Sequence, residues 1–266
     1  MNGLKKRKLS DLQVEYLASV DSTNDYLLRK AAEGCNTPLA CFAETQTQGK
    51  GRRNGRTWFS PPGSNVYLSL LWHFSKEPQA LSALGLAVAL CVVQTLEGIG
   101  IQKPVGIKWP NDLLSEGKKL GGILIESLPC HQGITRTVMG IGLNVYPFEA
   151  SEQSINQPWT TVQALSQTLI DRSQLAALLL DTLVETVLNF EAQGFEAFYN
   201  LWPRYDLTFN KNLTLTDARG SVQGRGRGIH TDGRLIVENA AGVLEYYASG
   251  EVSLRVHEAS WHSTPL

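Results

Sequence analysis

Residues 105–146 read "VGIKWPNDLLSEGKKLGGILIESLPCHQGITRTVMGIGLNVY". Three runs rich in β-branched and aliphatic side chains, at residues 105–109, 119–127 and 136–146, alternate with short segments of turn-forming residues. Neighbouring strands that are joined by short turns favour antiparallel pairing. This stretch therefore predicts the centre of a largely antiparallel sheet.

Glycines interrupt these predicted strands on one face. The alternation of side chains in residues 136–146 places Gly140, Gly142 and Asn144 opposite an apolar face, and Gly122 interrupts the preceding strand. A glycine inside a strand often marks a place where a ligand approaches the backbone closely. We interpret the glycines as the flat floor of a small-molecule site; the alternative is a set of unrelated bulges.

Lys108 is the candidate cation of this floor. It follows Gly106 in an apolar stretch and lies just before Pro110, so it is predicted near the end of a strand. A fixed lysine there would stabilise negative charge that develops on a phosphate. The alternative is a lysine that extends from the edge of the sheet into solvent.

The remaining sequence predicts an α+β fold with a mixed, largely antiparallel sheet and a small C-terminal β-barrel. A capping box at Ser22 and Asp25 begins a predicted helix that ends near Gly34. Further predicted elements are strands at 39–45 and 65–74, a buried helix at 80–97 and an amphipathic helix at 171–190. After a break at 203–206, short strands separated by glycine-containing turns predict the barrel.

Composition excludes several classes of protein. The 24 Lys and Arg residues against 25 Asp and Glu residues give a net charge of −1, so no global positive field attracts nucleic acid. The four cysteines form no CxxC pair and the five histidines no HxxxH pair, which argues against a zinc site or a disulfide framework and favours a reducing compartment. The most apolar stretch, residues 83–93, is too short to span a bilayer, so a soluble protein is expected.

A basic loop, "ETQTQGKGRRNGRTWFSP" at residues 44–61, separates two predicted strands. Lys50, Arg52, Arg53 and Arg56 lie among glycines with no carboxylate between them. The loop either binds an anion or is a solvated basic segment. Neither the P-loop motif nor the GxGxxG motif is present, so a nucleotide would have to bind in another way.

Taken in order along the chain, these motifs resemble the biotin protein ligase family. The matching segments are "STN" at 22–24, the basic loop, "KWPNDLL" at 108–114, "KLGGILIE" at 119–126, "GIGLNV" at 140–145, "NQPW" at 156–159 and "SGEVSLR" at 249–255. The resemblance implies a class II synthetase-like catalytic domain followed by an SH3-like domain. The implied division is a tail at 1–19, a biotin- and ATP-binding catalytic domain at 20–207 and the SH3-like domain at 208–266.

The resemblance also implies a reaction in two steps. Biotin and MgATP give biotinyl-5'-AMP and pyrophosphate, and a lysine of the biotin carboxyl carrier protein of acetyl-CoA carboxylase then takes the biotinyl group. The implied location is cytoplasmic, the implied state is a monomer or a homodimer, and no membrane is involved.

Roles carried over from the family fall on three sets of residues. Biotin contacts are implied for Ser22, Thr23, Asn24, Gln46, Lys50, Gly51, Arg52, Lys108 and Gly122. ATP or adenylate contacts are implied for Arg52, Arg53, Trp58, Lys108, Asn111, Asn144 and Arg255. Lys108 and Arg52 are the implied catalytic residues, and no side chain is expected to bind a metal.

Two features depart from the family pattern. Lys50 stands where an arginine is commoner and Asn54 is an extra residue; a lysine cannot form the bidentate contacts of an arginine. Only residues 1–21 precede Ser22, too few for the winged helix-turn-helix of the family members that repress transcription. We therefore expect a ligase without specific DNA binding.

Two other functions compete with this interpretation. A lipoate or octanoyl ligase or transferase would keep the sheet and a pocket lysine but not the basic loop beside KWPND. A nucleic-acid-binding module could use the basic loop together with the glycine-arginine segment at 224–233, but aromatic residues are not interleaved with the cations there.

Overall fold

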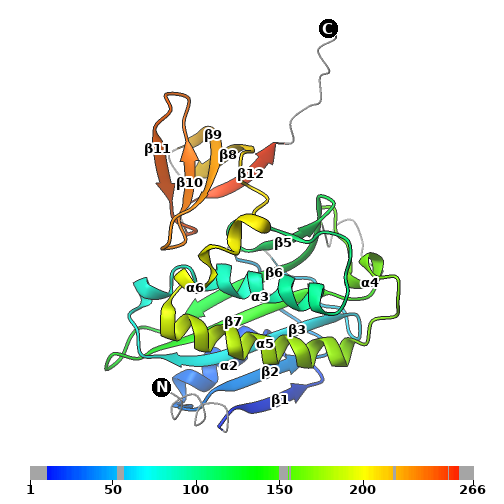
Figure 1. Cartoon of the computed structure of the whole chain (residues 1–266). Coiled ribbons are helices and arrows are strands. Elements are labelled where there is room, and N and C mark those ends of the chain that lie inside the picture. The colour runs from blue at the N-terminus through cyan, green and yellow to red at the C-terminus, as the bar shows by residue number, and fades with distance from the viewer. Residues whose placement is uncertain are drawn as a thin grey trace.

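The computed structural model describes residues 11–52, 57–149, 155, 157–217, 220–250 and 252–257. Its larger unit is built on a seven-stranded sheet with the order β1-β2-β3-β7-β6-β5-β4 (Figure 1). The strands are β1 (Gln13–Leu17), β2 (Leu39–Ala43), β3 (Asn65–Phe74), β4 (Gly106–Lys108), β5 (Asp112–Ser115), β6 (Lys118–Ser127) and β7 (Thr135–Asn144). Only the β1–β2 pair is parallel among the pairs of this sheet, which confirms the prediction of a mixed, largely antiparallel sheet.

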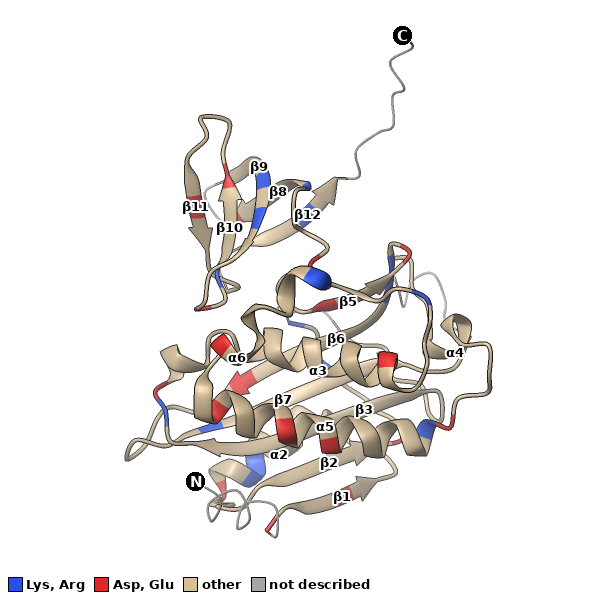
Figure 2. Ribbon diagram, viewed as in Figure 1, with Lys and Arg blue, Asp and Glu red and all other residues tan. Residues whose placement is uncertain are grey.

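Helices cover both faces of this sheet. The helices are α2 (Thr23–Ala32), α3 (Leu84–Gly98), α4 (Val162–Leu165), α5 (Arg172–Gln193) and α6 (Glu196–Tyr199), with 3-10 turns η1 (Pro78–Leu81) and η2 (Trp202–Arg204). Helices α3 and α5 pack on one face over the main hydrophobic core, whereas α2 packs on the other face (Figure 1). Acidic residues lie on the outer side of α5, as the amphipathic pattern predicts (Figure 2).

The C-terminal unit is a five-stranded antiparallel sheet with the order β11-β10-β9-β8-β12. Its strands are β8 (Asn212–Asp217), β9 (Gly220–Ile229), β10 (Leu235–Glu238), β11 (Leu244–Tyr247) and β12 (Ser253–His257). The β9–β10 turn rests on the larger unit, where Trp109 Nε1 donates to the Gly233 carbonyl at 3.0 Å and Ser82 Oγ donates to the Asp232 carbonyl at 2.7 Å. A second, small β unit was predicted from the sequence, and this prediction is confirmed.

Two elements differ from the sequence prediction. Residues 1–19 were assigned to a tail, but Gln13–Leu17 form β1 and pair in parallel with β2. The residues after Pro110 were assigned to turns, but Asp112–Ser115 form the short strand β5 between β4 and β6.

The helical segment Pro78–Gly98 is long and apolar enough to cross a membrane, but 72% of its most apolar window is buried in the core.

Candidate active site

A cavity of about 60 Å³ lies on the α2 face of the sheet. It is lined by the first residues of α2, the basic loop and the middle of β6 and β7. Of the nine biotin contacts that the resemblance implied, eight line this cavity together: Ser22, Thr23, Asn24, Gln46, Lys50, Gly51, Arg52 and Gly122. Trp58 and Asn111 line it as well, so the structure brings most of the predicted site residues to one place.

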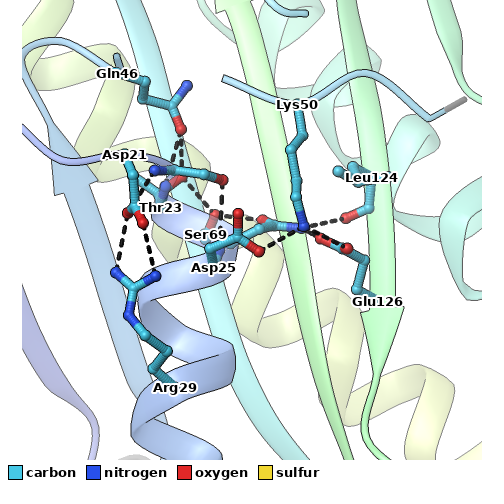
Figure 3. A network of polar contacts seen from close by, with 11 residues as sticks. Asp21, Thr23, Asp25, Arg29, Gln46, Lys50, Ser69, Leu124 and Glu126 are labelled. Carbon is cyan, nitrogen blue, oxygen red and sulfur yellow. Dashed lines mark hydrogen bonds and ion pairs between the residues drawn. The ribbon is translucent and has the colours of Figure 1, made fainter. Parts of the chain in front are cut away.

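One end of the cavity is a connected network of polar side chains at the start of α2 (Figure 3). Gln46 Oε1 accepts from the backbone N–H of Thr23 at 2.9 Å and from its hydroxyl at 3.1 Å. Ser69 Oγ lies 2.6 Å from Asn24 Oδ1 and 2.8 Å from Thr23 Oγ1. Because Thr23, Asn24 and Ser69 are each at most 4% exposed, these hydrogen bonds leave their side chains little freedom to turn.

The sequence explains why this network forms at the start of the helix. Ser22 is the N-cap of α2 and accepts from the backbone N–H of Asp25 at 3.4 Å, as the capping box predicts. The next residues therefore begin the helix and face β7. A Cβ atom at Gly140 would lie 2.2 Å from Asn24 Oδ1, so only glycine lets Asn24 approach the strand.

The floor of the cavity is made of glycines, and the indole of Trp58 lies on it. A Cβ atom at Gly142 would lie 2.7 Å from Trp58 Cε2, and one at Gly122 would lie 3.5 Å from Trp58 Cζ3. Trp58 Nε1 is buried, and no described residue accepts a hydrogen bond from it. Gly122, Gly140 and Gly142 therefore line one side of the cavity, where the missing Cβ atoms leave room for a flat ring. Binding of a small molecule on these glycines stays a prediction.

Lys119, which the sequence reasoning missed, supplies a cation to the cavity wall. Its Nζ lies 2.7 Å from Asp112 Oδ1 and 5.4 Å from the centroid of the Trp58 ring, and its side chain is 18% exposed. A bulge in β6 explains the omission: Leu113 pairs with Gly121 but Leu114 pairs with Lys119. The extra residue on β6 moves Lys119 to the face of Gly122, whereas strict alternation would place it on the opposite face.

Lys108 is not on the cavity floor. Lys108 is the last residue of β4, the edge strand of the sheet, and pairs with Asp112 of β5. Strands β5 and β6 lie between β4 and β7. Lys108 shares a face with the cavity but is not among the residues that line it. The neighbouring Gly106 is covered by Leu207, whose Cδ2 would lie 2.4 Å from a Cβ atom there. Lys108 therefore does not line this cavity, and the segment that leads to the C-terminal unit fills the space beside Gly106. A role of Lys108 in ligand binding stays a prediction.

Lys50 has two carboxylate partners from the protein itself. Its Nζ lies 2.5 Å from Asp25 Oδ1 and 3.0 Å from Glu126 Oε1 (Figure 3). Partial burial lowers the pKa of Lys50, but the hydrogen bonds to Asp25 and Glu126 outweigh it and raise the pKa above its ordinary value. The loop sequence shows no carboxylate near Lys50 because both partners come from other elements.

The other predicted ligand-binding residues lie in several places. Arg52 lines the cavity and donates through Nη1 to the Ser249 carbonyl in the β11–β12 turn. Asn144 does not line the cavity; its Nδ2 donates to the Thr160 carbonyl at 3.2 Å. Arg255 is exposed on β12 and does not line it either. Arg53 lies outside the described residues. The same holds for Arg56 and Asn54 of the basic loop, Asn156 of the NQPW segment and Glu251 of the SGEVSLR segment.

An aromatic cluster beside the cavity was also missed. The rings of Phe148 and Trp159 stack at 4.3 Å, and Phe59 lies 5.7 Å from Phe148. Trp159 pairs with Lys119 in an isolated parallel bridge, so the cluster adjoins the cation of the wall. Phe59 comes from the connection between β2 and β3, and Phe148 and Trp159 come from the connection between β7 and α4. Periodicity in the sequence gives no signal for such a cluster.

Among the described residues, no group of three or more His, Cys, Asp and Glu side chains is placed to hold a metal ion.

Comparisons with known proteins identify relatives of this chain. Residues 16–144 match the Biotin/lipoate A/B protein ligase family, and residues 208–255 match the Biotin protein ligase C terminal domain. The chain is 37% identical over 245 residues to the bifunctional ligase/repressor BirA of Escherichia coli K12, covering 92% of this chain and 75% of that protein. It is 30% identical over 248 residues to the biotin--[acetyl-CoA-carboxylase] ligase of Mycobacterium tuberculosis, covering 91% and 90%.

A solved structure gives the same result. The biotin protein ligase of Aquifex aeolicus in complex with biotin and ATP superposes with a TM-score of 0.76 at 29% identity, covering 92% of this chain and 99% of that one. A relative of at least 30% identity that is covered over nine tenths of both chains, together with the two domain matches, identifies the family. The chain belongs to the biotin protein ligase family.

Proposed function

We propose that the protein is an ATP-dependent biotin–[biotin carboxyl carrier protein] ligase. A carboxylate oxygen of biotin attacks the α-phosphorus of ATP, which forms the mixed anhydride biotinyl-5'-AMP and releases pyrophosphate. The amine of a carrier lysine then attacks the anhydride carbonyl, loses a proton, forms the amide and releases AMP. The carrier is the biotin carboxyl carrier domain of acetyl-CoA carboxylase, as the names of the relatives indicate.

The observation that carries this proposal is the arrangement of two unlike ends along one cavity. Thr23, Asn24 and Gln46 form a polar end whose donors and acceptors suit the ureido ring of biotin. The glycine floor suits the apolar part of the molecule, since a ring or chain can lie flat on a backbone without Cβ atoms. Lys119 and Arg52 provide cations where the carboxylate and the α-phosphate would meet.

We assign to Lys119 the role that the sequence suggested for Lys108. Asp112 holds the Lys119 ammonium at 2.7 Å, and the Lys119 side chain is only 18% exposed. A cation held in this way needs little reorganisation when charge develops on the phosphate. Lys119 is thus the proposed catalytic lysine, and Asp112 is the residue that positions it.

Arg52 is the proposed lid residue. It lies in the basic loop, lines the cavity and reaches the carbonyl of Ser249 in the C-terminal unit. An arginine that bridges the two units over a reactive anhydride would help to exclude water from it. ATP enters as its Mg²⁺ complex in this proposal, and the cytoplasmic location and the lack of specific DNA binding stay predictions.

The test is exchange of labelled pyrophosphate into ATP, measured in turn with biotin, lipoate and octanoate as the acid. We expect exchange with biotin and none above background with the other two acids. A second assay measures transfer of biotin to a purified carrier domain, with a carrier whose acceptor lysine is replaced by arginine as control. Exchange that depends on lipoate or octanoate but not on biotin would refute the proposal.

A further inference from the structure

Lys50 connects three elements that lie far apart in the sequence. It belongs to the basic loop, Asp25 to the first turn of α2, and Glu126 to β6. The ion pairs span 25 and 76 positions of the chain. All three side chains are partly buried, with exposed fractions of 37% for Lys50, 30% for Asp25 and 27% for Glu126.

Glu126 links Lys50 to the polar end of the cavity. Its Oε1 accepts from Lys50 at 3.0 Å, and its Oε2 accepts from the Asn24 amide at 2.9 Å (Figure 3). The same amide lies 3.4 Å from the Leu124 carbonyl, and Asn24 Oδ1 is held by Ser69. The carboxylate of Glu126 is thus one of three groups that hold the Asn24 side chain, and Lys50 donates to the other oxygen of that carboxylate.

The charges also argue against Lys50 as a phosphate ligand. Lys50 faces two carboxylates, so this cluster already carries more negative than positive charge. If the ammonium moved to a phosphate, Asp25 and Glu126 would be left partly buried, near each other and without a counter-ion. Leaving a hydrogen-bonded charge without its partner is costly, so the ammonium stays with the carboxylates.

We propose that Lys50 is a positioning residue for the ring-binding end of the cavity, acting through Glu126 on Asn24, and not a ligand of the ATP phosphates. This inference rests on the proposed function, because it concerns the end of the cavity assigned to the ureido ring. Lys50 then contributes to binding of biotin before ATP is present. The first cation of the basic loop thus has a different task from Arg52, which follows it two residues later.

The experiment measures biotin binding by calorimetry without ATP, followed by the KM for ATP at saturating biotin. Lys50→Met should weaken biotin binding roughly tenfold to a hundredfold, the loss expected for a charged hydrogen bond. Its KM for ATP should stay within about twofold of wild type. Lys50→Arg should bind biotin about as well as the wild type, in contrast to Lys50→Met, because a guanidinium can also bridge two carboxylates.

Two further variants separate positioning from general stability. In a Glu126→Gln background, Lys50→Met should add little to the loss of biotin affinity, because the carboxylate through which Lys50 acts is already gone. Lys103→Met removes an exposed ion pair with Glu116 away from the cavity and is the matched control, with biotin affinity unchanged. Thermal melting of each variant shows that it is folded.

Normal biotin affinity of folded Lys50→Met, with a raised KM for ATP, would overturn the inference and make Lys50 a phosphate ligand. Additive effects of Lys50→Met and Glu126→Gln would overturn the pathway through Glu126. Failure of the wild-type protein to bind biotin at all would refute the proposed function itself, and this outcome is distinct from the other two.

Discussion

Replacement of Lys119 by methionine tests the assignment of the catalytic cation most directly. Methionine keeps the length and apolar surface of the lysine stem but removes the ammonium that lies 2.7 Å from Asp112 and over the Trp58 ring. Lys108→Met is the matched control, because Lys108 lies on the same face of the sheet but outside the cavity lining. The two variants differ only in which of two lysines loses its charge.

The magnitude follows from the position of Lys119. Loss of one preorganised charge at a reacting centre costs about 3–4 kcal/mol, so kcat for adenylation should fall roughly 10²–10³-fold. Asp112 would remain as a carboxylate beside the phosphates and would repel them, so Asp112→Asn added to Lys119→Met should recover part of the loss. Lys108→Met should lower kcat by less than about threefold, because this half-buried lysine lies outside the cavity lining.

The assay is biotin-dependent pyrophosphate exchange at saturating biotin and ATP, with thermal melting to show that each variant is folded. Binding of biotin alone should be weakened less than kcat is lowered in Lys119→Met, since the polar end of the cavity is formed by other residues. If Lys108→Met loses more activity than Lys119→Met, the position of a lysine relative to this cavity does not indicate its role, and the reasoning fails.

Three further predictions concern the floor, the indole and one ion pair. Gly140→Ala should abolish biotin binding because its Cβ would displace Asn24, whereas Gly98→Ala, with open space around it, should bind normally in the same calorimetric titration. Addition of biotin should change the tryptophan fluorescence of the wild type, because a ligand on the glycine floor must move the Trp58 indole. The change should be much smaller in Trp58→Phe; equal changes in both proteins would contradict movement of Trp58. The Arg172 hydrogen bond lowers the pKa of Glu44, so the pair stabilises the fold above the ordinary pKa of 4.5 and loses this effect as the pH falls through the lowered value. Arg172→Met should thus lower the free energy of unfolding by about 1 kcal/mol or less at pH 7, because the ion pair is partly exposed. This loss should become smaller as the pH falls; a loss that is the same at all pH values would contradict the linkage.

Local sequence patterns predicted most of the fold. The capping box at Ser22, the strict alternation of β7 and the apolar stripe of α5 each depend on neighbours within a few residues, so their structure follows from the sequence alone. The short strand β5 was missed because its four residues follow a proline and resemble a turn. Strand β1 was missed because residues 1–19 were assigned together to a tail, although Gln13–Tyr16 alternate between polar and apolar residues.

The parts of the site that sequence reasoning missed depend on contacts between distant segments. Lys119 reaches the cavity only because of the bulge in β6, and a bulge is set by pairing with β5 rather than by β6 itself. Lys50 looked like a cation without a counter-ion because Asp25 and Glu126 come from other elements. The motifs identified which segments meet, but not which of two nearby lysines faces the cavity.

The contacts of the basic loop explain how a nearly neutral chain can carry several cations in one glycine-rich segment. Its described cations are directed to different partners: Lys50 to Asp25 and Glu126, and Arg52 to a backbone carbonyl of the C-terminal unit. Mutual repulsion is reduced because Lys50 is neutralised by the protein. Its ion pairs join the loop to the ring end of the cavity, whereas Arg52 joins the loop to the second unit. One loop can therefore serve recognition of the vitamin at its first cation and closure over the adenylate at its second, with each task carried by a different electrostatic partner.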